Sequence, residues 1–168
     1  DGDIVARYRK LHLFDVEVDG KNYEESATIA PGEETVVATL AGVPVGLSIC
    51  YDLRFPELYR RLAVRGARLV TVPAAFTAET GKDHWEVLLR ARAIENQVYV
   101  LAAAQCGTHP PGHACHGHSM IVDPWGVVMA QGAYREGVVV ADIDLAHADR
   151  IRKTLPALAH RREALFSY

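Results

Sequence analysis

The spacing of apolar and polar positions changes several times along the chain, from a strand-like to a helix-like period. Runs rich in β-branched residues and bounded by turn residues predict strands over residues 4–8, 35–40, 43–49, 68–73, 97–105, 118–122, 127–130 and 137–143. Apolar residues at helical spacing predict helices from Pro56 to a stop at Gly66, over 84–96 and over 145–152. Residues 18–32 and 107–117 are expected to be loops. Strands that alternate with helices in this way indicate a single α/β domain over residues 1–168.

The composition narrows the range of partners. Apolar residues make up 49% of the chain, charged residues 23%, and the formal net charge is −3. So small a charge argues against nucleic acid or an anionic membrane surface as a partner. No apolar run approaches the roughly 18 residues that a membrane-spanning helix needs. We therefore expect a small molecule as the ligand.

The chain contains three cysteines, an odd number without the spacing of a disulfide framework. This pattern favours a reducing compartment, and the cytoplasm is the expected location. The first residues include neither an initiator Met nor the pattern of a signal peptide, so we expect them to lie within a domain.

Cys50 ends an apolar, strand-like run and precedes a polar turn and a predicted helix. A side chain at such a strand-to-helix turn projects into a cleft, next to free backbone N–H groups. The nearby helix N-terminus favours the thiolate, which is the nucleophilic form of cysteine. An isolated free cysteine is more often a buried core residue. The surroundings of Cys50 instead predict a nucleophile.

Five motifs occur along the chain in a fixed order. They are Tyr8-Arg9-Lys10-Leu11-His12-Leu13-Phe14-Asp15, Glu25-Ser26, Gly46-x-x-Ile49-Cys50-Tyr51-Asp52-x-Arg54-Phe55-Pro56-Glu57, the run 84–97, and Gly117-His118-Ser119-x-x-Val122-Asp123-Pro124-Trp125-Gly126. Together they resemble the nitrilase superfamily, the carbon–nitrogen hydrolases. The likeness is strongest to amidases that act on small amide-bearing carboxylates, namely the deaminated-glutathione amidases and the ω-amidases.

This resemblance implies a fold and an assembly. The fold is a four-layer α-β-β-α sandwich, in which two mixed sheets pack face to face between outer helices. No cofactor is expected. Members of the superfamily pair through helical faces, so we expect a homodimer, with the apolar stripe of 84–96 and the C-terminal residues 155–168 as candidate contacts.

The resemblance also implies roles for individual residues. Cys50 matches the nucleophile, and Lys10 matches the lysine that stabilises the oxyanion together with the backbone N–H of Tyr51. The Lys10 ammonium is expected to lower the pKa of the thiol. Glu25 matches the glutamate that positions the substrate and the catalytic groups. Contacts with the substrate are expected from Arg54, Phe76, Thr77 and His84.

One component of the family pattern is missing. The general base of these enzymes is a glutamate well before the lysine motif, whereas only Asp1 and Asp3 are acidic before Lys10, and neither lies in a matching motif. We therefore expect that the N-terminal third of the family domain is absent from this sequence. On that interpretation, residues 1–168 alone are inactive.

The predicted reaction is the hydrolysis of a carboxamide to a carboxylate and ammonia, through a Cys50 thioester. One alternative is an inactive fragment or binding module that keeps the fold without the base. Another is a zinc-binding interaction domain on residues 106–118, whose possible ligands are Cys106, His109, His113, Cys115, His116 and His118. Because His118 already belongs to a family motif, we expect no metal.

Two further predictions concern packing. Asp52 and Arg54 are expected to form an ion pair that braces the turn at Cys50, although Arg54 is also available for a substrate carboxylate. Trp85 and Trp125 are expected to be core or interface aromatics rather than residues that stack on the substrate.

Overall fold

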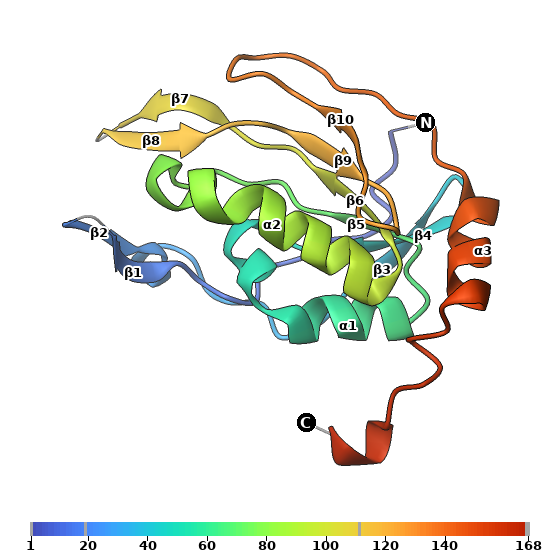
Figure 1. Cartoon of the computed structure of the whole chain (residues 1–168). Coiled ribbons are helices and arrows are strands. Elements are labelled where there is room, and N and C mark those ends of the chain that lie inside the picture. The colour runs from blue at the N-terminus through green and yellow to red at the C-terminus, as the bar shows by residue number, and fades with distance from the viewer. Residues whose placement is uncertain (1, 19, 111, 167–168) are drawn as a thin grey trace.

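The computed structural model describes residues 2–18, 20–110 and 112–166, and a six-stranded mixed sheet forms its centre (Figure 1). The strand order is β10-β9-β6-β5-β4-β3. The bounds are β3 Val37–Leu40, β4 Val43–Leu47, β5 Leu69–Thr71, β6 Tyr99–Ala102, β9 Met120–Val122 and β10 Val128–Gln131. The inner strands β4, β5 and β6 are parallel, and the outer strands pair antiparallel with their neighbours. The carboxyl ends of β4, β5 and β6 therefore meet at one edge of the sheet.

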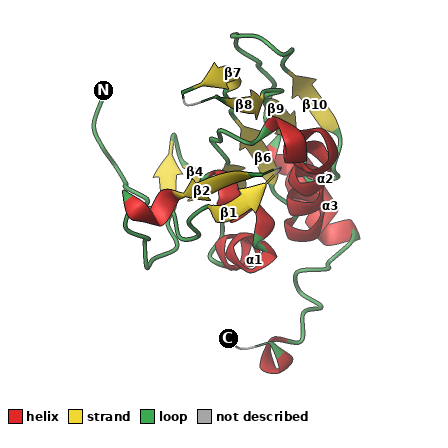
Figure 2. Ribbon diagram, turned by 90° about the vertical axis from the view of Figure 1, so that its left-hand side faces the viewer, coloured by secondary structure: helices red, strands yellow, loops and turns green. Residues whose placement is uncertain are grey.

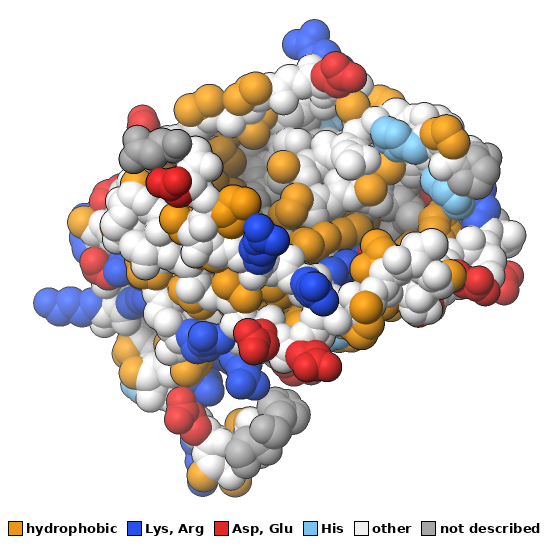
Figure 3. Space-filling view, turned by 180° about the vertical axis from the view of Figure 1, so that it is seen from behind, with side chains coloured by type: hydrophobic (Ala, Val, Ile, Leu, Met, Phe, Trp, Pro, Cys, Tyr) orange, Lys and Arg blue, Asp and Glu red, His pale blue; other side chains and the backbone are white. Residues whose placement is uncertain are grey.

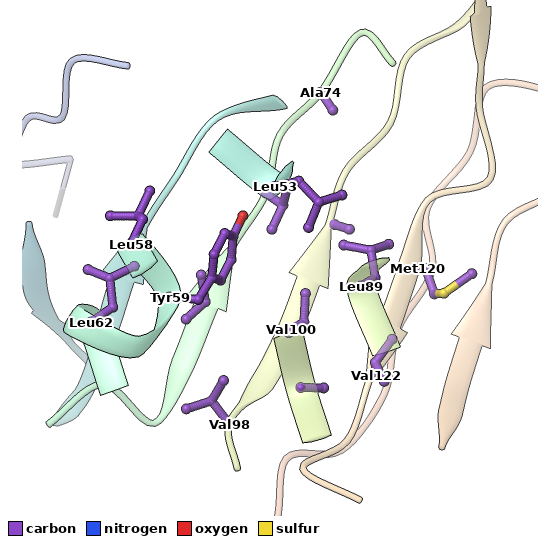
Figure 4. Close-up of a cluster of buried hydrophobic side chains, with 14 of the residues drawn as sticks. Leu53, Leu58, Tyr59, Leu62, Ala74, Leu89, Val98, Val100, Met120 and Val122 are labelled. Atoms are coloured by element: carbon purple, nitrogen blue, oxygen red, sulfur yellow. The ribbon is translucent and has the colours of Figure 1, made fainter. Parts of the chain in front are cut away.

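Two helices, α1 (Pro56–Val64) and α2 (Ala78–Asn96), cover one face of this sheet. Their buried side chains interlock with those of the parallel strands, as Figure 4 shows for Tyr59 and Leu62 of α1, Leu89 of α2 and Val100 of β6. Burial of this apolar surface is the main contribution to the stability of the domain. No helix in the described part of the chain is both long and apolar enough to cross a membrane.

The opposite face of the sheet is covered at one end by α3 (Leu145–Thr154). Ala148 of this helix packs against Val45, Leu69 and Tyr99, which lie on neighbouring strands. Seen from behind, the molecule is hollowed, and hydrophobic side chains lie in and around the hollow (Figure 3).

Two short hairpins extend from the same side of the sheet and face the viewer in Figure 2. One consists of β1 (Asp15–Val18) and β2 (Lys21–Glu24), followed by the short 3-10 helix η1 (Glu25–Ala27). The other consists of β7 (Cys106–His109) and β8 (His113–His116). They meet where the rings of Tyr23 and His113 lie 4.5 Å apart. The prediction of loops over 18–32 and 107–117 was therefore wrong for the paired residues of these hairpins, whose backbone N–H and C=O groups bond across each turn, and right for residues 28–32, which have no helix or strand assignment.

The other main elements agree with the sequence pattern. Strands over 35–40 and 43–49 form the predicted hairpin, and the helices after Pro56 and over 145–152 are confirmed. Helix α2 begins earlier than His84, at Ala78, where the Gly81 N–H donates to the Thr77 carbonyl (2.8 Å). Gly81 is required because a Cβ there would lie 2.3 Å from the Cβ of His116 on β8.

Two predicted strands do not form. Residues 4–8 and 137–143 have no strand assignment and pair with no described strand. Val138 and Val140 are 89% and 80% exposed. Their β-branched side chains therefore gain no packing energy that would favour a strand. Of the two tryptophans, Trp85 is fully buried in the core, and Trp125 is 56% exposed, which leaves the interface role as the remaining prediction for it.

Candidate active site

Cys50 lies at a strained turn directly after β4. It starts the 3-10 helix η2 (Cys50–Arg54), and its φ of +48° lies in the left-handed region that residues with a Cβ rarely adopt. The Cys50 N–H donates to the Pro73 carbonyl (2.9 Å), which ties the turn to the chain that leaves β5. Such strain at a nucleophile is typical of functional sites, and the predicted strand-to-helix turn is confirmed.

A cavity of about 550 Å³ opens at the carboxyl edge of the parallel strands. Cys50 enters it from the end of β4, Ala75 from the chain after β5, and Gln105 from the chain after β6. Lys10 and Glu25 line the same cavity. The fold therefore brings together the three residues to which the sequence motifs assigned catalytic roles, although 25 to 40 residues separate Cys50 from the other two.

Lys10 is buried, with 7% of its surface exposed, and its ammonium forms an ion pair with Glu25. Glu25 also accepts a hydrogen bond from the Phe14 N–H (2.7 Å). The Lys10 carbonyl accepts one from the Gly32 N–H (2.8 Å). These contacts hold the buried ammonium in one place at the cavity wall, so Lys10 is not a solvated surface lysine.

The pKa of the Cys50 thiol is raised above its ordinary value, mainly by burial. The Lys10 charge and the backbone N–H groups of Ala75 and Tyr51 lower this pKa, and the Glu25 charge raises it. The expected lowering of the pKa by Lys10 is therefore present, but removal of the thiolate from water outweighs it. A raised pKa favours the thiol over the thiolate, so a proton acceptor beside Cys50 would assist its attack.

A smaller pocket of about 20 Å³ adjoins Cys50, lined in part by Arg54, Phe76 and Thr77. The Arg54 guanidinium carbon lies 5.0 Å from the centre of the Phe76 ring. Its Nη1 lies 3.2 Å from Nδ1 of His84, which does not itself line the pocket. Three of the four predicted substrate-binding residues thus lie together beside Cys50, and the fourth lies behind Arg54.

The predicted ion pair between Asp52 and Arg54 does not form. Asp52 is fully buried and accepts hydrogen bonds from Tyr8, His12 and the Ile49 backbone. Arg54 points the other way, into the small pocket, and burial lowers its pKa. Residues two apart in a 3-10 helix lie on different sides of the helix, which the spacing in sequence did not reveal.

The His and Cys side chains of β7 and β8 form no metal site. Within the described residues, no group of three His, Cys, Asp or Glu side chains is placed to hold an ion. The hairpin register puts Cys106 opposite His116 and Cys115 opposite Gly107. Successive side chains on a strand point to opposite faces, so the possible ligands are divided between two faces. The geometry gives no support to the zinc-binding alternative.

Several residues that line the large cavity were missed in the sequence. They include Asn22 and Tyr23 on β2, His113 on β8, and Gln105. A signal for the first two was present, since Asp15-Val16-Glu17-Val18 alternates polar and apolar residues before a turn at Gly20.

The sequence pattern of the carbon–nitrogen hydrolases matches residues 1–153, a stretch that includes Lys10, Glu25 and Cys50. The chain belongs to the carbon–nitrogen hydrolase family. The matched stretch includes all five motifs that resemble the nitrilase superfamily.

Relatives of this chain include the deaminated glutathione amidase of Synechocystis, which is 52% identical over 164 residues, or 96% of this chain and 60% of that protein. The human deaminated glutathione amidase is 51% identical over 168 residues, or 98% of this chain and 51% of that protein. The chain thus spans between 51% and 60% of the length of these relatives.

Solved structures confirm the α/β fold of the carbon–nitrogen hydrolase sandwich. The Caenorhabditis elegans NitFhit protein superposes with a TM-score of 0.90 at 50% identity, over 97% of this chain and 40% of that chain. An amidase from Nesterenkonia superposes with a TM-score of 0.80 at 34% identity, over 98% of this chain and 56% of that chain. In that amidase structure, the acetamide moiety of fluoroacetamide is covalently attached to the active site cysteine. In that amidase, the active site cysteine is thus the residue that forms the covalent bond.

Proposed function

We propose that residues 1–168 are part of a single carbon–nitrogen hydrolase domain that hydrolyses the amide bond of a small, carboxylate-bearing substrate. The observation that carries this proposal is the convergence of Cys50, Lys10 and Glu25 on one cavity. A reducing compartment such as the cytoplasm suits this chemistry, since Cys50, Cys106 and Cys115 are all free thiols.

In the proposed reaction, the Cys50 sulfur attacks the amide carbonyl carbon, and the thiol proton passes to a base. The carbonyl oxygen becomes an oxyanion, which the Lys10 ammonium and the Tyr51 backbone N–H stabilise. The carbon–nitrogen bond then breaks, and the amine leaves with a proton. Water attacks the resulting thioester, releases the carboxylic acid and restores the thiol.

Glu25 is proposed to position Lys10 rather than to accept the thiol proton. Its carboxylate forms an ion pair with the Lys10 ammonium and accepts the Phe14 N–H, so it is already held by two donors. The resemblance assigns the general base to a glutamate that precedes the lysine motif. Asp3, the acidic residue described before Lys10, does not line the cavity.

The two pockets that adjoin Cys50 suggest how the substrate binds. Arg54 places a positive charge at the small pocket, and no acidic side chain in the described residues forms an ion pair with it. We propose that the acyl part of the substrate directs a carboxylate to Arg54, with Phe76 and Thr77 beside it and His84 behind the guanidinium. The leaving amine then faces the cavity of about 550 Å³, which has room for ammonia and for larger amines.

Arg54→Met is expected to raise KM about 10- to 100-fold for an amide that carries a carboxylate, since a hydrogen bond to a charged group contributes about 1.5–3 kcal/mol. For a neutral amide of the same size, KM should change little. Steady-state kinetics with the two substrates measure this difference.

The matched control is Arg150→Met, which removes an exposed arginine on α3 that pairs with Asp144. It should leave both KM values unchanged. An equal loss for charged and neutral amides in Arg54→Met would contradict carboxylate recognition. Binding of amides without turnover by the unmodified protein would favour the binding-module alternative.

We further propose a homodimer, through the exposed face of α2 and the C-terminal residues rather than through the buried stripe of that helix. The stripe on α2 that contains Trp85, Leu89 and Ala93 is buried against the sheet of the same chain, so it is not available for a partner. Val87 and Ile94 are 65% and 49% exposed on the same helix. Leu155, Leu165 and Phe166 are exposed near the C-terminus, while Ser167 and Tyr168 lie outside the described residues.

Val87→Glu combined with Ile94→Glu is therefore expected to convert the dimer to a monomer, because burying two carboxylates at the contact is unfavourable. Sedimentation equilibrium of the full protein measures the mass. An unmodified protein that is monomeric, or a double variant that remains dimeric, would reject this surface.

A further inference from the structure

One buried carboxylate joins the segment that carries Lys10 to the turn that carries Cys50. Asp52 is fully buried, and its two oxygens accept four hydrogen bonds. From the lysine segment, the Tyr8 hydroxyl donates at 2.7 Å, the His12 N–H at 3.0 Å and the His12 Nδ1 at 2.8 Å. From the cysteine turn, the Ile49 N–H donates at 2.9 Å.

The residues of this network lie close in sequence to the two reacting groups. Tyr8 and His12 lie two residues on either side of Lys10, and Asp52 lies two residues after Cys50. The His12 ring also stacks on the Phe55 ring at the end of η2, with ring centres 3.6 Å apart and planes 6° apart. The lysine segment is thus fixed to the cysteine turn on both sides of Lys10.

This arrangement matters because the lysine segment lacks the support of a sheet. Residues 2–10 have no helix or strand assignment. A fully buried carboxylate is stable only where donors surround it, so Asp52 favours the single chain arrangement that supplies all four donors. Burial and the Asp52 carboxylate raise the pKa of Tyr8 well above its usual range, so its hydroxyl remains a donor.

We propose that Tyr8, Asp52 and His12 form a positioning cluster that holds the Lys10 ammonium against the Cys50 sulfur. This inference rests on the proposed function, in which Lys10 lowers the pKa of the thiol and stabilises the oxyanion. The members of the cluster do not line the cavity around Cys50, so they act through Lys10 rather than on the substrate.

The test uses alkylation of Cys50 by iodoacetamide, which requires no substrate, together with steady-state kinetics of the full protein. Tyr8→Phe removes one hydroxyl, and His12→Phe keeps the stacked ring but removes the Nδ1 donor. Each should slow alkylation of Cys50 about 5-fold at neutral pH, because a displaced ammonium leaves less thiolate. Each should also lower kcat about 10-fold, with KM within about 2-fold. His12→Asn restores a donor near the Nδ1 position and should recover most of both rates.

Two controls separate positioning from general stability. Tyr99→Phe removes another buried hydroxyl, which donates to the Asp144 carbonyl (2.9 Å) away from the site, and should lower the melting temperature without changing alkylation of Cys50. In a Lys10→Met background, Tyr8→Phe should add less than about 2-fold to either loss, since the two changes remove one function.

The proposal would be overturned if Tyr8→Phe lowered kcat or the alkylation rate by the same factor in the Lys10→Met background as in the unmodified protein. It would also be overturned if Tyr8→Phe lowered the melting temperature but left the alkylation of Cys50 unchanged. If the unmodified protein hydrolyses no amide, the proposed function fails. The alkylation rates alone then decide on the cluster, and equal rates in the unmodified protein and in Tyr8→Phe would overturn it.

Discussion

Replacing Cys50 by serine is expected to abolish amide hydrolysis in the full protein, with a loss in kcat on the order of 10³-fold or more. A serine hydroxyl is far less acidic than a thiol, so the Lys10 charge, which lowers the pKa of Cys50, would produce much less of the ionised nucleophile from serine. The measurement is ammonia or amine release from a small amide-bearing carboxylate.

The fold should survive this change. Cys50 already adopts a φ of +48°, and serine or alanine meets the same backbone strain, so the melting temperature should change little. Cys106→Ser is the matched control, since Cys106 is a free thiol that does not line the cavity. Activity that persists in Cys50→Ser and Cys50→Ala would reject Cys50 as the nucleophile.

Replacing Lys10 by methionine is expected to lower kcat by about 10²–10³-fold, the loss typical of removing one oxyanion donor. KM should change little, because the ammonium matters most where negative charge develops in the transition state. Since Lys10 also lowers the pKa of Cys50, the pH at which alkylation of Cys50 becomes fast should move upward in this variant.

The change also leaves the Glu25 carboxylate without its cation, which introduces a stability effect of its own. Lys10→Met combined with Glu25→Gln removes both charges and should recover the melting temperature but not kcat. A KM that rises while kcat stays constant would identify Lys10 as a substrate-binding residue instead. Recovery of kcat in the double variant would reject the oxyanion role.

Local pattern was sufficient to predict much of the site. The apolar run before Cys50 and the polar turn after it indicated a strand-to-helix turn, and the structure places Cys50 at that turn. The lysine and glutamate motifs identified Lys10 and Glu25, which do line the cavity with Cys50. The turn at Cys50 could be predicted because strand periodicity and turn chemistry depend on neighbouring residues, whereas Lys10 and Glu25 followed from the family resemblance.

The sequence pattern gave wrong predictions for segments whose structure depends on whether another strand pairs with them. Residues 4–8 and 137–143 have strand-like composition but pair with no described strand. Conversely, the polar segment around Gly20 and the His-rich segment around Gly112 form hairpins. In each segment, one strand pairs with the other across the turn. Composition records what a residue prefers and does not record whether a partner strand is present.

By itself, the sequence determined the order of the strands of the central sheet and of helices α1, α2 and α3, the motifs of the carbon–nitrogen hydrolase family and the identity of the candidate nucleophile. Only the tertiary structure decided that Asp52 bonds to Tyr8 and His12, 44 and 40 residues away, rather than to Arg54 nearby. It also decided that burial of Cys50 outweighs the Lys10 charge and raises the pKa of the thiol. The physical reason is that hydrogen-bond partners and desolvation depend on atoms brought together by the fold, whereas periodicity and turn chemistry act between neighbours in the chain.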